Sequence, residues 1–207
     1  MRLGIMGGTF DPIHLGHLHV ARVALREAAL DSVLFLPDGD PPHKQPGASG
    51  ADRLKMTQLA IKQDPAFWVS DMELRRPGRT YTVDTLMALL KEDPARELHY
   101  LIGADTLFQF PSWKTAHKVA TLCSMLVVPR PGTDLDEVRW FMRKLFADFG
   151  LQSSLLSQPG PDISSTQIRE RVKAGEDISA LVSRAVALYI AENGLYRPAP
   201  SQNNKQD

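Results

Sequence analysis

The stretch LGIMGGTFDPIHLGH, residues 3–17, gives the clearest indication of the fold, because its pattern changes at a pair of glycines. Residues 3–6 form a short apolar run that ends at Gly7 and Gly8, which is typical of a buried strand followed by a turn. Over residues 15–28, apolar side chains recur at spacings of three and four, which predicts an amphipathic helix. The chain therefore opens with a strand, a glycine turn and a helix.

The same alternation of short apolar runs and amphipathic segments continues along the chain. Further strands are predicted at residues 33–36, 67–72, 98–102 and 124–128, with an edge strand at 154–156, and helices at 52–62, 82–91, 137–149, 164–173 and 178–192. Apolar strands that alternate with helices are typical of a parallel sheet covered on both faces. We therefore predict an α/β fold, a doubly wound, mainly parallel, Rossmann-like sheet with C-terminal helices. Residues 1–196 are expected to form a single domain and residues 197–207 a disordered tail.

The segments that follow the first and fourth predicted strands are expected to meet in space. In the common strand order 3-2-1-4-5, these two strands lie side by side where the winding reverses, and ligands bind beyond their carboxyl ends. Those ends carry GGTFDP, residues 7–12, and GAD, residues 103–105. The sequence therefore predicts a ligand crevice between them.

The composition limits the kinds of partner. The 207 residues include 24 Lys plus Arg and 24 Asp plus Glu. A chain that binds a long polyanion usually has a basic excess, so nucleic acid is not an expected partner. The one cysteine allows neither an internal disulfide nor a Cys-based metal site, and neither a signal peptide nor a membrane span is predicted. We expect a cytoplasmic protein that binds small molecules, and whether it forms a homo-oligomer is left open.

His14 and His17 stand three residues apart at the start of the first predicted helix, so they share a face that points back toward the glycine turn. Three interpretations are open: a capping and a packing histidine, two ligands of a metal ion, or two hydrogen-bond donors to phosphate. The metal interpretation lacks a third ligand at a recognised spacing, so no metal site is predicted. Because the helix N-terminus favours a bound anion, we favour the phosphate interpretation.

Other polar and aromatic residues also have both a structural and a functional interpretation. Lys44 is either a surface lysine or a cation that reaches phosphate from a Pro-rich loop. Asp105 either caps a helix or accepts hydrogen bonds from ribose hydroxyls, and Trp113 either packs in the core or covers a pyridine ring. Residues 164–166, Ser-Ser-Thr, either cap the next helix or, together with Arg169, hold a polyphosphate.

The stretch GGTFDPIHLGH resembles the signature of the nucleotidylyltransferase superfamily, whose H-x-G-H motif, here His14, Gly16 and His17, holds ATP phosphates. Further motifs occur in the order expected of the bacterial nicotinate-nucleotide adenylyltransferase family. They are PPHK at 41–44, TYTVDTL at 80–86, GAD at 103–105, the Trp113 region and ISSTQIR at 163–169. The resemblance covers roughly residues 1–196.

This resemblance implies transfer of the adenylyl group of ATP to nicotinate mononucleotide, giving nicotinate adenine dinucleotide and pyrophosphate by in-line displacement without a covalent intermediate. Mg²⁺ is expected as a cofactor that arrives with ATP. The implied catalytic residues are His14, His17, Lys44 and Arg169. The implied ATP-binding residues are Gly7, Gly8, Thr9, Phe10, Asp105, Ser164, Ser165 and Thr166, and the implied mononucleotide-binding residues are Asp38, Tyr81, Thr82 and Trp113.

Two positions depart from the family pattern. A second aromatic residue often follows the tryptophan, whereas Lys114, Thr115 and Ala116 follow Trp113 here. Asp38 stands where a neutral residue is common. Both departures concern the pyridine side of the predicted site and leave the ATP side unchanged.

Other functions are open alongside adenylyl transfer to nicotinate mononucleotide. The same chemistry on nicotinamide mononucleotide or another phosphate acceptor is the nearest, and the long segment 38–81 argues against the shorter phosphopantetheine enzymes. A non-catalytic nucleotide sensor is disfavoured because both histidines, Lys44 and Arg169 are present. A metallohydrolase that uses the two histidines is the third alternative.

Overall fold

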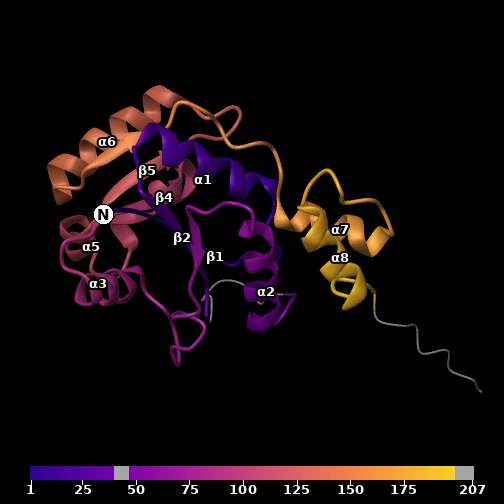
Figure 1. Cartoon of the computed structure of the whole chain (residues 1–207). Coiled ribbons are helices and arrows are strands. Elements are labelled where there is room, and N and C mark those ends of the chain that lie inside the picture. Colours follow the sequence, from indigo (N-terminus) through magenta and orange to yellow (C-terminus); the bar gives the residue numbers. More distant parts are fainter. Residues whose placement is uncertain (40–46, 199–207) are drawn as a thin grey trace, which may run out of the picture.

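The computed structural model describes residues 1–39 and 47–198, and its centre is a six-stranded sheet (Figure 1). The strands are β1 (Arg2–Gly8), β2 (Ser32–Pro37), β3 (Phe67–Val69), β4 (Glu97–Gly103), β5 (Ser124–Val128) and β6 (Ser153–Leu155). Their order is β3-β2-β1-β4-β5-β6, and every neighbouring pair is parallel. The predicted fold class is confirmed, and so is the predicted adjacency of the first and fourth strands.

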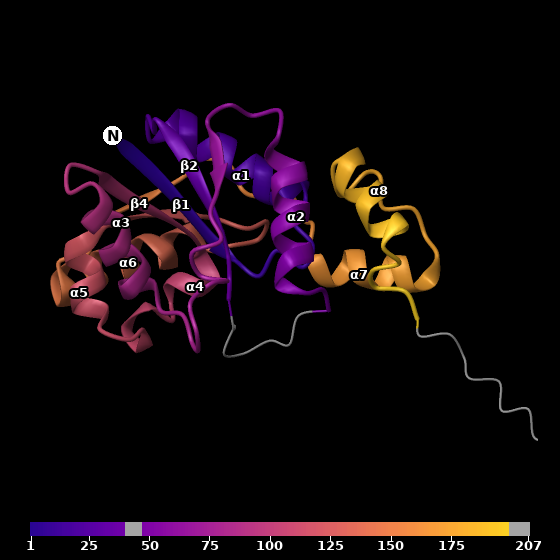
Figure 2. The same cartoon turned by 60° about the horizontal axis from the view of Figure 1, so that its bottom comes forward.

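Helices cover both faces of the sheet because successive strand residues point to opposite sides. In β2, Val33 and Phe35 enter one hydrophobic cluster, whereas Leu34 and Leu36 enter the other. The first cluster takes side chains from α1 (Leu15–Glu27), α2 (Gly50–Ile61), α7 (Ser165–Ala174) and α8 (Arg184–Glu192). The second takes them from α3 (Thr82–Glu92), α4 (Ala104–Leu107), α5 (Ala116–Leu122) and α6 (Leu135–Phe149). The two helical layers are seen from a second side in Figure 2.

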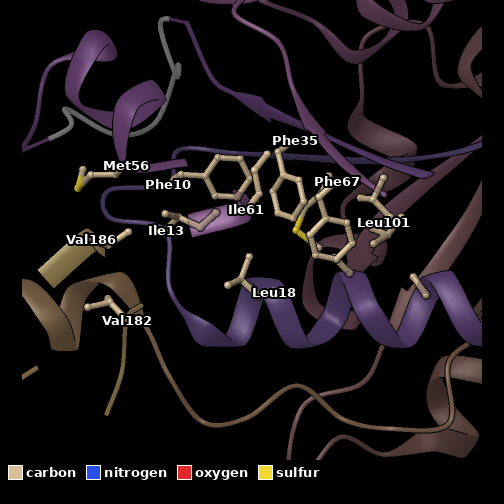
Figure 3. Packing of buried hydrophobic residues seen from close by; sticks show 14 of the residues in the cluster. Phe10, Ile13, Leu18, Phe35, Met56, Ile61, Phe67, Leu101, Val182 and Val186 are labelled. Carbon is tan, nitrogen blue, oxygen red and sulfur yellow. The ribbon is translucent and has the colours of Figure 1, made fainter. Parts of the chain in front are cut away.

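The C-terminal helices share their core with the start of the chain. Figure 3 shows Val182 and Val186 beside Ile13 of the β1–α1 loop, and Leu18 of α1 lies in the same cluster. The backbone N–H of Leu15 donates to the carbonyl of Leu181 (2.9 Å), which adds a direct link. This packing places the N-terminus of α7 against the loop that follows β1.

The structure differs from the sequence-based prediction mainly in where helices begin. The predicted helix 178–192 begins at Arg184, because the Ser183 hydroxyl accepts from the backbone N–H of Val186 (3.4 Å) and so caps the helix there. Residues 104–122 hold α4, a short 3₁₀ helix (Phe110–Ser112) and α5, none of which was predicted. Elements this short have too few turns to show a helical period.

Candidate active site

A cavity of about 750 Å³ lies beyond the carboxyl ends of β1, β4 and β5. Its size is that of an ordinary small-molecule site. Four chain segments line it: residues 6–20, 101–103, 128–131 and 160–169. The predicted crevice between the β1 and β4 ends therefore exists, and the N-terminal part of α7 also lines it.

The imidazole rings of His14 and His17 stack at this cavity, with centroids 3.7 Å apart and ring planes 27° apart. The backbone N–H of His14 donates to Nδ1 of His17 (3.2 Å), so a neutral His17 carries its proton on Nε2. An added Cβ at Gly16 would lie 2.9 Å from Nδ1 of His14, which explains why the motif has glycine between the two histidines. The pair is therefore a fixed unit that offers ring N–H groups.

Both imidazoles are held in their neutral form in the free protein. Burial lowers the pKa of His14 to about 4, and the positive charge of Arg130 adds to the effect. Burial also lowers the pKa of His17 well below its usual value, with smaller contributions from His14 and Arg130. At neutral pH the rings can donate hydrogen bonds to phosphate without being cations themselves.

The buried His14 predicts a loss of stability in acid. The unfolded chain binds a proton at this residue near pH 6.5, whereas the folded protein does so near pH 4, so acid favours unfolding across that interval. We expect His14 alone to lower the free energy of unfolding by about 3 kcal/mol between these two pH values. Urea unfolding at both ends of the interval, with wild type and His14→Gln, measures it, and an equal loss in the variant would contradict the assignment.

The loop between β1 and α1 packs against the histidine pair and is itself held by contacts to neighbouring segments. Phe10 is buried, has a left-handed backbone (φ 49°), and sets its ring edge-on to His17 at 5.0 Å. Thr9 lines the cavity and donates its hydroxyl to the Asp38 carboxylate (3.1 Å). The buried Arg53 of α2 donates to the carbonyls of Thr9 (2.7 Å) and Asp38 (2.8 Å). Arg53 thus joins the loops that follow β1 and β2, and sequence analysis did not single it out.

The N-terminus of α7 is fastened to the same loop. Ser164 caps the helix by accepting from the backbone N–H of Gln167 (3.1 Å), and the Ser165 hydroxyl donates to the carbonyl of Pro12 (2.9 Å). Arg169 donates to the carbonyl of Asp11 (2.8 Å) and to the Thr166 hydroxyl (3.2 Å). Four residues of this segment line the same cavity as the histidine pair: Ser164, Ser165, Thr166 and Arg169. The structure therefore brings together the predicted phosphate residues from both ends of the chain.

Arg130 is a cavity residue that sequence analysis missed. It lies two residues after the end of β5 and forms an ion pair with Asp105 (3.2 Å), and both side chains are exposed. Asp105 itself stands beside the cavity wall formed by Gly103. The signal that could have found Arg130 is its place in VPRPG, directly after a buried parallel strand, where ligands of such sheets bind.

The residues predicted for the pyridine side lie around the half-buried Tyr100 of β4, outside the lining of this cavity. Its hydroxyl forms a hydrogen bond with Thr82, and burial raises the pKa of this phenol. An added Cβ at Gly7 would lie 2.5 Å from the same hydroxyl, so the end of β1 approaches Tyr100 closely here. Trp113 packs edge-on against Tyr100 at 5.9 Å, and Nζ of Lys114 lies 3.9 Å above the Tyr81 ring.

One predicted site residue, Lys44, lies outside the described residues. The predicted tail also lies outside them from residue 199 onward. In the described ranges, no group of three or more His, Cys, Asp and Glu side chains is arranged to hold a metal ion. No helix in those ranges has the length and apolarity needed to cross a membrane.

The model of the cytidylyltransferase-like family matches residues 5–171. The chain belongs to this family. Two relatives of this cytidylyltransferase-like chain carry the name probable nicotinate-nucleotide adenylyltransferase. The one from Synechococcus sp. (strain JA-3-3Ab) is 43% identical over 197 residues, 94% of each chain. The one from Thermus thermophilus is also 43% identical over 197 residues, 95% of this chain and 100% of that protein. The family predicted from the motifs is confirmed.

A solved structure supports the cytidylyltransferase-like fold. It is the Plasmodium falciparum nicotinic acid mononucleotide adenylyltransferase complexed with NaAD, with a TM-score of 0.80 and 20% sequence identity. The match covers 94% of this chain and 97% of that one. At this identity the likeness supports the arrangement of strands and helices, and the chemistry has to be argued from the site itself.

Proposed function

We propose that this chain transfers the adenylyl group of ATP to nicotinate mononucleotide, giving nicotinate adenine dinucleotide and pyrophosphate. The observation that carries the proposal is that the neutral His14–His17 stack and Arg169 line one cavity. This arrangement suits a polyphosphate, and the names of the 43% identical relatives supply the acceptor. A cytoplasmic location stays a prediction.

The reaction is a direct displacement at phosphorus. An oxygen of the mononucleotide 5′-phosphate bonds to the α-phosphorus of ATP, and the bond from that phosphorus to the oxygen bridging to the β-phosphorus breaks. The electron pair leaves with pyrophosphate. Such a reaction requires alignment of the two substrates and neutralisation of charge on the phosphate oxygens, and it requires no protein nucleophile.

The ATP side is assigned to residues at the cavity. The Nε2–H of His17 donates to an α-phosphate oxygen, and His14 with the backbone of residues 8–10 holds the neighbouring oxygens. Arg169, with Ser165 and Thr166 at the start of α7, holds the β- and γ-phosphates. The positive charge of Arg130, which already acts on both histidines, favours the same anion. Lys44 is proposed to act between the two substrates, and Ser164 and Asp105 are proposed to bind ATP. Mg²⁺ would arrive with ATP and help to neutralise the charge of its phosphate groups.

The mononucleotide side is assigned to the cluster around Tyr100. Tyr81, Thr82 and Trp113 are proposed to form the pyridine pocket, with backbone N–H groups of this segment facing the nicotinate carboxylate. Lys114 supports this assignment because its ammonium lies over the Tyr81 ring, where it adds a positive charge near an anionic substituent. Asp38 is the opposing negative charge and reduces the preference for the acid over the amide.

Pyrophosphate release with ATP and one mononucleotide at a time tests the proposed function. We expect release with nicotinate mononucleotide, and slower release with nicotinamide mononucleotide. The absence of release with the nicotinate substrate would contradict the proposal. Turnover of phosphopantetheine would indicate another acceptor. ATP binding without release of pyrophosphate would indicate a nucleotide sensor, and stoichiometric metal in the purified protein would indicate a metallohydrolase.

A further inference from the structure

The buried carboxylate of Asp11 joins three distant parts of the chain next to the cavity. Asp11 is 4% exposed, and its carboxylate accepts from the backbone N–H groups of Gly47 (2.7 Å) and Ala48 (3.0 Å). The hydroxyl of Tyr196, which is 185 residues away in the sequence, donates to it at 2.8 Å. The guanidinium of Arg169 lies 3.7 Å from the same carboxylate. A buried negative charge with this many partners has a fixed position.

Tyr196 is held in an unusual way for a residue close to the end of the chain. Its backbone is left-handed (φ 63°), a conformation that costs free energy for any residue other than glycine. The residue is nevertheless 9% exposed and packs in the same hydrophobic cluster as α1 and α8. Burial raises the pKa of its phenol, with Asp11 adding to the effect, so the hydroxyl keeps its proton and donates it. The surrounding structure therefore fixes this hydroxyl on Asp11 despite the backbone strain.

A chain of contacts leads from this hydroxyl to the cavity. Tyr196 fixes the carboxylate of Asp11, and both the carbonyl and the carboxylate of Asp11 face the guanidinium of Arg169. The other terminal nitrogen of the guanidinium, Nη2, donates to the Thr166 hydroxyl. Arg169 is only partly exposed, and its two terminal nitrogens are bonded to Asp11 and Thr166, so Asp11 is one of the two residues that hold the guanidinium at the cavity.

We propose that Tyr196 is a positioning residue for the triphosphate of ATP: its hydroxyl fixes the Asp11 carboxylate, which in turn orients the Arg169 guanidinium toward the cavity. The inference rests on the proposed function, because that function gives Arg169 its phosphate ligand. Tyr196 itself touches no substrate and acts through two other side chains. Loss of its hydroxyl should therefore weaken the hold on phosphate groups and leave the hold on the nucleoside unchanged.

The test is calorimetric titration of the Tyr196→Phe variant, which keeps the ring and removes only the hydroxyl. Inorganic tripolyphosphate probes the phosphate site, and adenosine probes the nucleoside site. We expect the Kd for tripolyphosphate to rise about fivefold to tenfold. Without the hydrogen bond from Tyr196, the Asp11 carboxylate is held less firmly, and Arg169 is therefore oriented less well toward phosphate. The Kd for adenosine should stay at the wild-type value. A role in stability alone would not separate the two probes.

Tyr189→Phe is the matched control. Tyr189 also donates its hydroxyl to a carboxylate, that of Asp52 (2.9 Å), and it also belongs to the C-terminal part of the chain, but it does not line the cavity. Neither tyrosine lines the cavity, but Asp11, the partner of Tyr196, does so, whereas Asp52 does not. This variant should therefore bind tripolyphosphate as wild type does. In an Arg169→Ala background, Tyr196→Phe should have no further effect on tripolyphosphate, because its route to the phosphate is already gone.

The inference is overturned by three results: wild-type tripolyphosphate binding in Tyr196→Phe, an equal weakening of both probes, or the same weakening in Tyr189→Phe. These titrations involve no turnover, so they can be read separately from the proposed reaction. If wild type releases no pyrophosphate but its tripolyphosphate binding depends on Tyr196, the proposed function fails and the positioning role stands.

Discussion

Replacing His17 with alanine is expected to lower kcat by about 10²- to 10³-fold, the usual effect of removing one fixed donor to developing negative charge. The ring is fixed by stacking on His14, by the edge contact with Phe10 and by the bond to its Nδ1, so its Nε2–H has a set direction. ATP should still bind in part, because Arg169 and the start of α7 are unchanged. Steady-state pyrophosphate release gives kcat, and calorimetry gives the Kd for ATP.

Two further variants define the role of His17. His17→Gln retains an N–H donor without an imidazole, and we expect it to recover part of the lost kcat, because the ring is neutral in the free protein and acts as a donor. His19→Ala, on the same helix but outside the cavity lining, is the control and should turn over as wild type does. Near-normal kcat in His17→Ala would remove this residue from the mechanism. Equal losses in the Ala and Gln variants would show that a donor alone is not enough.

The fold was predictable because its signals are local and periodic. The apolar run before Gly7, the helical spacing after Leu15 and their repetition along the chain predict a parallel sheet without any knowledge of contacts. The crevice followed from topology, since the carboxyl ends of adjacent parallel strands lie at one edge. The shared face of His14 and His17 was predictable from their spacing of three at the start of a helix, although the stacking of their rings was not predicted. The cap at Ser164 was predictable because Ser-Ser-Thr precedes a helical segment.

The parts of the site that sequence reasoning missed depend on contacts between distant residues. Asp11 stands inside the quoted motif, yet nothing in the sequence indicates that Tyr196 and Ala48 donate to it. The ion pair of Arg130 with Asp105 likewise joins the ends of two strands that are separated by a helical segment. Trp113 was given two interpretations: its ring packs edge-on against Tyr100 beside the second hydrophobic cluster, and its role in a pyridine pocket stays a prediction. Periodicity describes which face a residue occupies, and it carries no information on which residue lies opposite.

Arg169→Ala is expected to lower kcat/KM for ATP by about 100-fold, mostly through a higher KM, since a charged hydrogen bond to phosphate contributes about 1.5–3 kcal/mol. Arg169→Lys should recover little of this loss. Nη1 of the guanidinium donates to the Asp11 carbonyl and Nη2 donates to the Thr166 hydroxyl. A single ammonium group cannot make both hydrogen bonds and also reach a phosphate. Initial rates over a range of ATP concentrations, at saturating mononucleotide, measure the effect.

The loss must be distinguished from a disturbed fold, since removing Arg169 leaves the buried Asp11 carboxylate with one partner fewer. That carboxylate keeps two backbone N–H donors and the Tyr196 hydroxyl, so we expect the variant to fold, with only a modest drop in its unfolding temperature. Arg171→Ala, on the same helix and in contact with Glu176 at the surface, is the matched control and should leave kcat/KM unchanged. A folded Arg169→Ala variant with a normal KM for ATP would contradict the phosphate assignment. A rise in KM that Arg171→Ala shares would mean that the charge of α7, and not the forked contact of Arg169, attracts the triphosphate.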